Sequence, residues 1–256
     1  MPENFFDILM ILMTIVRKIF LIIVLALCLA SCEKADFETA HRAYQSGDYK
    51  QALKQLTILA NEDDAKAQNN LGFMCLNGIG VKKNYGDALK WFRKAAHHGV
   101  AEAQHSMGFM YAEGLGTAPV PAIALKWYRL AAKQGLSQAQ FNLAYMYENE
   151  IGIRRNDKEV FYWYREAAKK GNLVAQYKLG LMYLNGIGVE KNQLKAYAWF
   201  GVASAGGYEQ ALSPRDAIGM QLDEEKLTKA RNMARELWLM HNMIDVIKAP
   251  ADDNST

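Results

Sequence analysis

The chain has 256 residues, of which 51% are hydrophobic and 22% are charged, so it is long enough to bury a large core. Its formal net charge is only +3 and no Lys/Arg-rich block stands out, which argues against a nucleic-acid-binding groove. Two of its three cysteines lie near the amino end, which leaves Cys75 alone in the body and excludes an internal disulfide framework there.

The amino end has the pattern of an export signal. An apolar run from Ile19 to Ala30 follows two basic residues, and it is too short to span a hydrocarbon core of ~30 Å. The small residues before Cys32 resemble the lipobox of bacterial lipoproteins, in which the chain is cut before a cysteine that becomes lipid-bearing. This resemblance implies a signal peptide over residues 1–31, a lipid on Cys32 and a membrane location, and Glu33 indicates the outer membrane.

The start of this segment leaves an alternative open. Residues 1–12 fit the export pattern less well because they include two acidic residues, so Met13 is the expected natural start. The alternative is a transmembrane anchor formed by residues 5–30. It would place Arg17 and Lys18 inside the membrane, at a cost of about 2.5–3.5 kcal/mol each.

Residues 32–63 are expected to form a helical hairpin that caps the body at its amino end. Apolar residues between positions 37 and 44 share one helical face, Gly47 and Asp48 predict a turn, and apolar residues then continue at helical spacing. This stretch resembles a tetratricopeptide-type hairpin.

From residue 64 onward the sequence repeats itself every 36 residues. A period of this size indicates a solenoid or an array of small units. The five series that share the spacing are Trp91, Trp127, Trp163 and Trp199; Gly99, Gly135, Gly171 and Gly207; Ala67, Ala103, Ala139, Ala175 and Ala211; Leu71, Met107, Leu143 and Leu179; and Gly80, Gly116, Gly152 and Gly188.

Each 36-residue unit reads as two helices. In the first unit, a paired-glycine loop ends the first helix, Asn84 with Asp87 predicts the N-cap of the second, and Gly99 supplies a left-handed residue after it. Cys75 stands where later units have tyrosine, and we expect it to be a small core residue. A lone hairpin of this kind cannot bury both of its apolar sides, so the units must stack.

These residues resemble the Sel1-like repeat, whose order is Ala-x-Ala, Leu-Gly, an aromatic residue, Gly-x-Gly-Val, Ala-x-x-Trp, Ala-Ala and a closing Gly. The resemblance implies an all-α, right-handed superhelical solenoid related to tetratricopeptide arrays. Four repeats would occupy residues 64–207 and capping helices residues 208–248, and the polar tail 249–256 is expected to be disordered. The third repeat departs most, because Ala144 and Glu150 replace glycines.

The histidines are the main candidates for catalysis or metal binding. His97, His98 and His105 are close in sequence, but no cysteine or His-Glu-x-x-His pattern accompanies them. A position in a last helical turn, where partial positive charge is favourable, explains the first two, and a metal site is the alternative. The Gly-x-Gly pairs lack the Lys-Ser/Thr of a phosphate loop. We therefore predict no catalytic residue, metal or cofactor.

The expected binding surface is the inner curve of the solenoid, which first helices line in tetratricopeptide arrays. The positions that would face a ligand lie two before and two after the Leu-type position. They are Asn69, His105, Phe141 and Tyr177, and Phe73, Phe109, Tyr145 and Leu181. Such an aromatic stripe suits an apolar or peptide partner. The alternative is that several of these rings belong to the core between repeats.

The resemblance implies a membrane-anchored, non-catalytic adaptor of the bacterial envelope that binds protein partners through its concave face. Secreted members of the family often meet host cells or envelope assemblies. One alternative is an envelope enzyme, such as a peptidoglycan- or β-lactam-directed hydrolase, which would need a converging nucleophile and base. Another is a spacer lipoprotein without a selective groove.

Overall fold

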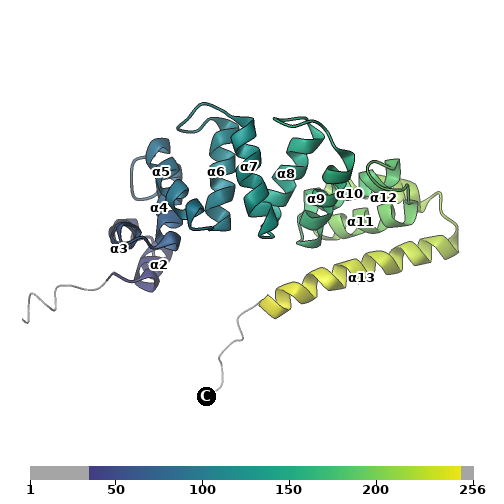
Figure 1. Ribbon diagram of the computed structural model, residues 1–256. Helices are drawn as coiled ribbons and strands as arrows, with labels where there is room; N and C mark the ends of the chain where they lie inside the picture. Colours follow the sequence, from purple (N-terminus) through teal and green to yellow (C-terminus); the bar gives the residue numbers. More distant parts are fainter. Residues whose placement is uncertain (1–34, 249–256) are drawn as a thin grey trace, which may run out of the picture.

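The computed structural model describes residues 35–248, with side chains described as far as residue 240. All regular secondary structure in this range is helical, and consecutive helices pack on one another in a curved row (Figure 1). The all-α solenoid predicted from the repeats is thereby confirmed. The expected signal peptide, Cys32 and the tail 249–256 lie outside the described residues. Within those residues, no helix is both long enough and apolar enough to cross a membrane.

The helices form a cap hairpin, four repeat hairpins and a closing segment. Their bounds are α2 (Phe37–Gln45) and α3 (Tyr49–Asn61); α4 (Ala65–Asn77) and α5 (Tyr85–His97); α6 (Ala101–Glu113) and α7 (Pro121–Lys133); α8 (Ser137–Glu148) and α9 (Asp157–Lys169); α10 (Leu173–Asn185) and α11 (Gln193–Ala205); and η1 (Glu209–Ala211), α12 (Leu212–Gly219) and α13 (Glu224–Lys248). We call α4, α6, α8 and α10 the first helices of the repeats, and α5, α7, α9 and α11 the second helices.

The helix ends follow the capping residues of the sequence. Asn84 and Asn156 each accept backbone N–H groups of the following helix through their side-chain oxygens, as predicted. The first helices of repeats one, two and four end at a left-handed glycine. In repeat three, Glu150 stands at this position and adopts a positive φ of 57°. The inter-helix loop therefore keeps its left-handed turn without the glycine.

The core of each hairpin is one ring of the second helix seated against a small residue of the first. The rings are those of Phe92, Tyr128, Tyr164 and Phe200, all buried, and each lies one residue after a tryptophan of the 36-residue series. At Gly108 a Cβ atom would lie 2.6 Å from Cδ1 of Tyr128, so only glycine fits without a shift. Repeat three has Ala144 at this position and still buries its ring.

Adjacent hairpins are joined by a repeated glutamine. Gln104 donates from Nε2 to the carbonyl oxygen of Ala96 at 3.2 Å, which links a first helix to the last turn of the preceding second helix. Gln68, Gln140 and Gln176 make the same bond at the same distance. A second link runs from Arg129 to the Tyr147 hydroxyl at 2.9 Å, with a longer counterpart from Arg93 to Tyr111 at 3.5 Å.

The last hairpin is closed by α13. Gly201 of α11 stands where the earlier second helices carry Arg93, Arg129 and Arg165, and a Cβ atom there would lie 3.2 Å from Cβ of Ala234. The loss of the arginine thus lets α13 pack closely on α11. Figure 1 shows α13 running back beneath the row of hairpins.

Candidate functional site

A groove with a volume of about 650 Å³ lies on the first-helix face, over α4, α6 and α8. Its rim carries Phe73, Phe109 and Tyr145, one ring from each of these helices, and their side chains are 47%, 38% and 46% exposed. Soluble proteins usually bury side chains of this size, so a row of exposed rings along a hollow indicates a binding surface. We call this cavity the aromatic groove.

A second cavity of about 400 Å³ adjoins the aromatic groove on its amino-terminal side. It shares Phe73 and Ser106 with the groove, and it is otherwise lined by residues of α2 to α6, including His41, Tyr44 and Asn69. The two cavities are therefore neighbours, and together they extend from the cap hairpin to the third repeat.

The floor of the aromatic groove holds three polar residues, His105, Tyr128 and Asn142, and Glu113 is the acidic residue among the lining. The side chains of Asn142 and His105 are 3.1 Å apart, between the amide nitrogen and Nε2 of the ring. Because an amide nitrogen only donates, Nε2 accepts, and the proton of the neutral imidazole lies on Nδ1. The rings of His105 and Tyr128 are packed with centroids 5.4 Å apart. These three residues come from three different helices.

Burial keeps both titratable groups of the floor in their neutral forms. Desolvation lowers the pKa of His105 below its ordinary value of 6.5, so the ring is uncharged at pH 7. Desolvation also raises the pKa of Tyr128 to about 12, only partly opposed by the contact with Asn142, so the phenol stays protonated. These two groups therefore offer hydrogen bonds without a net charge.

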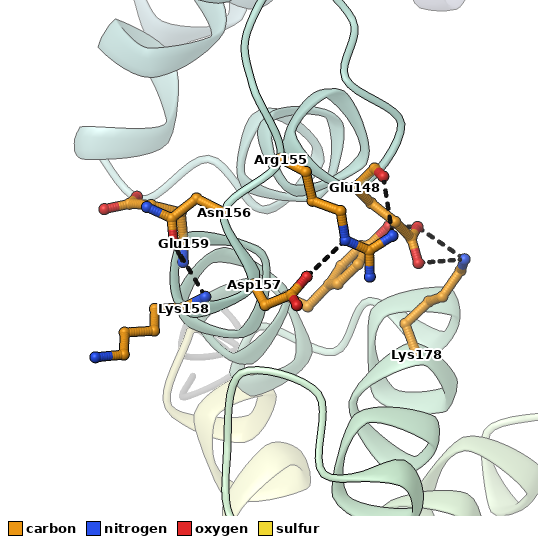
Figure 2. A network of polar contacts seen from close by, with 8 residues as sticks. Glu148, Arg155, Asn156, Asp157, Lys158, Glu159 and Lys178 are labelled. Atoms are coloured by element: carbon orange, nitrogen blue, oxygen red, sulfur yellow. Dashed lines mark hydrogen bonds and ion pairs between the residues drawn. The ribbon is translucent and has the colours of Figure 1, made fainter.

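At the carboxyl end of α8 a polar network joins this helix to its neighbours (Figure 2). Glu148, the last residue of α8, accepts the Tyr164 hydroxyl at 2.7 Å and Nζ of Lys178 at 2.8 and 3.0 Å. Arg155 also points to the end of this helix, and it donates to Oδ1 of Asp157 at 2.7 Å. The Glu148–Lys178 ion pair crosses from α8 to α10. The positions 36 and 72 residues before Glu148 hold Ala112 and Leu76, which line the aromatic groove.

The repeats match a known family model. The Sel1 repeat model matches residues 65–100, 101–136, 137–172 and 173–208, which together are more than half of the chain. The chain belongs to the Sel1 repeat family. Sel1 repeats generally act as scaffolds for protein–protein interactions.

Solved structures of Sel1 repeat proteins share this fold. A Sel1 repeat protein from Oxalobacter formigenes is 30% identical over 78% of this chain and 85% of its own, with a TM-score of 0.69. The protective antigen c5321 of uropathogenic Escherichia coli strains is 24% identical over 81% of this chain, with a TM-score of 0.52. The present chain spans only 54% of that antigen. Comparison with curated proteins finds no match.

Six of the eight residues predicted to face a ligand line the two cavities of this Sel1 array. They are Asn69, Phe73, His105, Phe109, Phe141 and Tyr145. Tyr177 and Leu181 of the fourth Sel1 repeat line neither cavity. The ring of Tyr177 instead packs between Phe200 and Tyr208, with centroid separations of 5.6 and 5.2 Å. Both partners belong to the fourth matched repeat, so the ring of Tyr177 packs within one repeat instead of lining a cavity.

The three neighbouring histidines have separate surroundings. The ring of His97 lies against Trp127 with centroids 5.8 Å apart, Nε2 of His98 is 3.2 Å from Asp63, and His105 belongs to the groove floor. In the part of the chain with described placement, no three His, Cys, Asp or Glu side chains are grouped as metal ligands. The three histidines therefore do not converge.

Two residues of the groove floor, Tyr128 and Asn142, escaped the sequence prediction. Tyr128 lies on a second helix, and the prediction considered first helices alone. The 36-residue series of Phe92, Tyr128, Tyr164 and Phe200 is the signal that identifies it, because a hydroxyl on a buried ring requires a partner nearby. Asn142 lies one residue after Phe141, at a position whose counterparts are Asn70, Ser106 and Lys178.

Proposed function

We propose that this Sel1 repeat protein binds a segment of a partner protein in the aromatic groove over α4, α6 and α8. The observation that carries the proposal is the row of exposed rings of Phe73, Phe109 and Tyr145 along a cavity of about 650 Å³. Rings of this kind supply large contact area at low cost in side-chain entropy, and they dominate the energy of many interfaces. The general role of Sel1 repeats as interaction scaffolds supports the same conclusion.

The chemistry of the groove defines the segment that it accepts. The rim favours apolar side chains, while the uncharged floor of His105, Tyr128 and Asn142 suits one neutral polar group, such as a backbone amide or a hydroxyl. Helices pack about 10 Å apart, so three adjacent first helices span about 20 Å. An extended peptide covers that length with about six residues. The expected ligand is therefore a short apolar segment without charges at its centre.

Selection from a random peptide library followed by fluorescence anisotropy tests this proposal. The full chain in neutral detergent is the bait, and the selected peptides are titrated against it and against the double variant Phe109→Ala with Tyr145→Ala. Removing two rings that contact the ligand is expected to weaken binding at least tenfold, since each hot-spot ring contributes about 2 kcal/mol. Selected sequences should carry apolar residues and lack central charges.

A matched control is available on the second helices. Leu130 of α7 and Tyr162 of α9 are as exposed as the groove rings, but they line neither cavity. The double variant Leu130→Ala with Tyr162→Ala should bind the selected peptides as the unmodified chain does. If the groove variant and this control bound the selected peptides with equal affinity, the proposal would be contradicted.

We further propose that a lipid on Cys32 anchors the protein to the bacterial outer membrane. The support is the lipobox-like sequence that ends at Cys32 and the glutamate that follows it. A Cys32→Ser variant should lose incorporation of labelled fatty acid and leave the membrane fraction. Cys28→Ser, inside the same apolar run, is the control and should keep both. Continued lipid labelling of the Cys32→Ser chain would contradict the anchor.

A further inference from the structure

A basic pocket lies between α11, α12 and α13, away from the aromatic groove. Its volume is about 290 Å³, and it shares no lining residue with either cavity of the first-helix face. Three of its nine lining residues are arginines, namely Arg215, Arg231 and Arg235, and none is acidic. Three guanidinium groups from two helices thus gather around one small cavity.

Two of these arginines have no counter-charge. Arg215 is held in place, because it donates to the Ser204 hydroxyl at 3.1 Å and to the carboxylate of Asp216 at 2.8 Å. The side chains of Arg231 and Arg235 make no hydrogen bond or ion pair with any residue of 35–240. They lie four residues apart on α13, a spacing at which like charges repel. The pocket therefore carries about two unneutralised positive charges.

The walls of the pocket are apolar. Tyr197 and Trp238 contribute rings, and Gly201 lies between α11 and α13 where the two helices pack closely. The earlier repeats hold Arg93, Arg129 and Arg165 at the position of Gly201, so a large side chain stands there in every other copy. The closing segment thus combines two features that the repeats do not have, a cleared floor and arginines supplied by α12 and α13.

We propose that this pocket binds a phosphomonoester group carried on an apolar or aromatic moiety. A phosphomonoester has a charge of about −1.5 to −2 at pH 7, which matches the two unpaired guanidiniums. Arginine forks bind phosphate oxygens in pairs, and Arg215 supplies a third, pre-oriented donor. The moiety would lie against Trp238 and Tyr197, as a ligand with one charged end and one apolar end requires. The group can belong to a soluble ester or to a lipid head.

Calorimetric titration of the full chain in neutral detergent micelles tests the site, with phenyl phosphate and inorganic phosphate as probes. Phenyl phosphate should bind more tightly than inorganic phosphate, because only the ester contacts the aromatic walls. The double variant Arg231→Gln with Arg235→Gln should weaken phenyl phosphate binding at least tenfold, since hydrogen bonds between charged groups are the strong ones. Phosphatidic acid added to the micelles distinguishes the sources. Displacement of phenyl phosphate assigns the site to a lipid head, and no displacement assigns it to a soluble ester.

The matched control removes two positive charges from the same helix outside the pocket. Lys226 and Lys229 pair with Asp223 and Glu225 at the surface, and neither lines the pocket. The variant Lys226→Gln with Lys229→Gln should bind phenyl phosphate within about twofold of the unmodified chain, as expected for distant charges screened by salt. Equal loss in both variants, or no loss in the arginine variant, would overturn the proposal.

Two further measurements separate this site from folding and from the aromatic groove. Both variants should melt within a few degrees of the unmodified chain, since the substituted residues are exposed. The arginine variant should still bind the peptides selected for the aromatic groove, while Phe109→Ala with Tyr145→Ala should still bind phenyl phosphate. A variant that loses binding at one site is therefore expected to keep binding at the other.

Discussion

The two halves of the first-helix face have the same framework and opposite character. From α4 to α8 the positions that point between repeats hold small or neutral residues such as Ala112 and Asn142, and a cavity remains. From α8 to α10 the corresponding positions hold Glu148 and Lys178, whose ion pair bridges the two helices, and Tyr177 packs onto Tyr208. Hairpins with the same framework thus give a surface with or without a cavity, depending on the residues at two or three positions in each repeat.

The largest effect should come from the framework that both halves share. Gly108→Val places a branched side chain where even a Cβ atom would lie 2.6 Å from Tyr128, and we expect a loss of about 3 kcal/mol in unfolding free energy. Urea denaturation followed by circular dichroism measures it. Gly86→Ala is the control, because that exposed helical glycine has room for a Cβ atom and should lose nothing. A small loss for Gly108→Val would mean that the ring and its helix are not closely packed.

The next largest effect should come from opening the closed half. Glu148→Leu leaves Lys178 and the Tyr164 hydroxyl without their partner, at a cost of about 2 kcal/mol in unfolding free energy. Adding Lys178→Ser removes the stranded charge and should recover part of the loss. If the comparison is correct, the double variant also gains a longer groove and accepts longer peptides in the anisotropy assay. Unchanged stability of Glu148→Leu would show that the network does not hold the two helices together.

A smaller effect is expected at the start of the second helix of the third repeat. Asn156 caps α9 by accepting the backbone N–H groups of Lys158 and Glu159, and Asn156→Ala should cost about 1 kcal/mol in unfolding free energy. Lys158→Ala, at an exposed position in the same turn, should change stability by less than half of that. Thermal unfolding of both variants measures the difference. A loss at Lys158 equal to that at Asn156 would argue against the cap.

The smallest effect should be the pH response of the open half. Burial holds the pKa of His105 below its unfolded value of about 6.5. As the pH falls below that value, the unfolded chain therefore binds a proton at this residue more readily than the folded chain does. The contribution of His105 to stability is therefore complete above about pH 6.5 and is lost as the pH falls below it. His105→Phe, which copies Phe141, should flatten this part of the curve. Urea midpoints measured from pH 7.5 to pH 5 test this, and an equal slope in both chains would contradict it.

The fold could be predicted from sequence because its requirements are local and repeated. Glycine and alanine recur wherever a ring or a neighbouring helix leaves no room for a larger residue, as at Gly108 against Tyr128. The rim of the aromatic groove could be predicted for the same reason, since the 36-residue period places Phe73, Phe109 and Tyr145 at the same position of three first helices.

The features that could not be predicted depend on contacts with other repeats or with residues outside the 36-residue period. Tyr177 was expected on the open surface, but its ring packs against Tyr208, the last residue of the fourth matched repeat, which is not part of the 36-residue series used for the prediction. The Glu148–Lys178 pair joins residues 30 positions apart, and neither belongs to the repeated motif. The basic pocket could not be predicted because α13 has no counterpart in the repeats, so its register on α11 does not follow from the 36-residue spacing.

Gly201 also limits where a further repeat can be added to this protein. Inside the array each junction carries a glutamine bond to the preceding carbonyl, and the first two second helices reach a tyrosine of the next repeat through Arg93 or Arg129. A duplicated unit inserted between residues 101 and 172 would recreate these contacts on both sides. An extra unit after residue 208 would meet Gly201, which has no side chain to offer, and would have to displace α13. Duplication of a repeat can therefore lengthen the array in its middle, whereas addition of a repeat at the carboxyl end requires the displacement of α13.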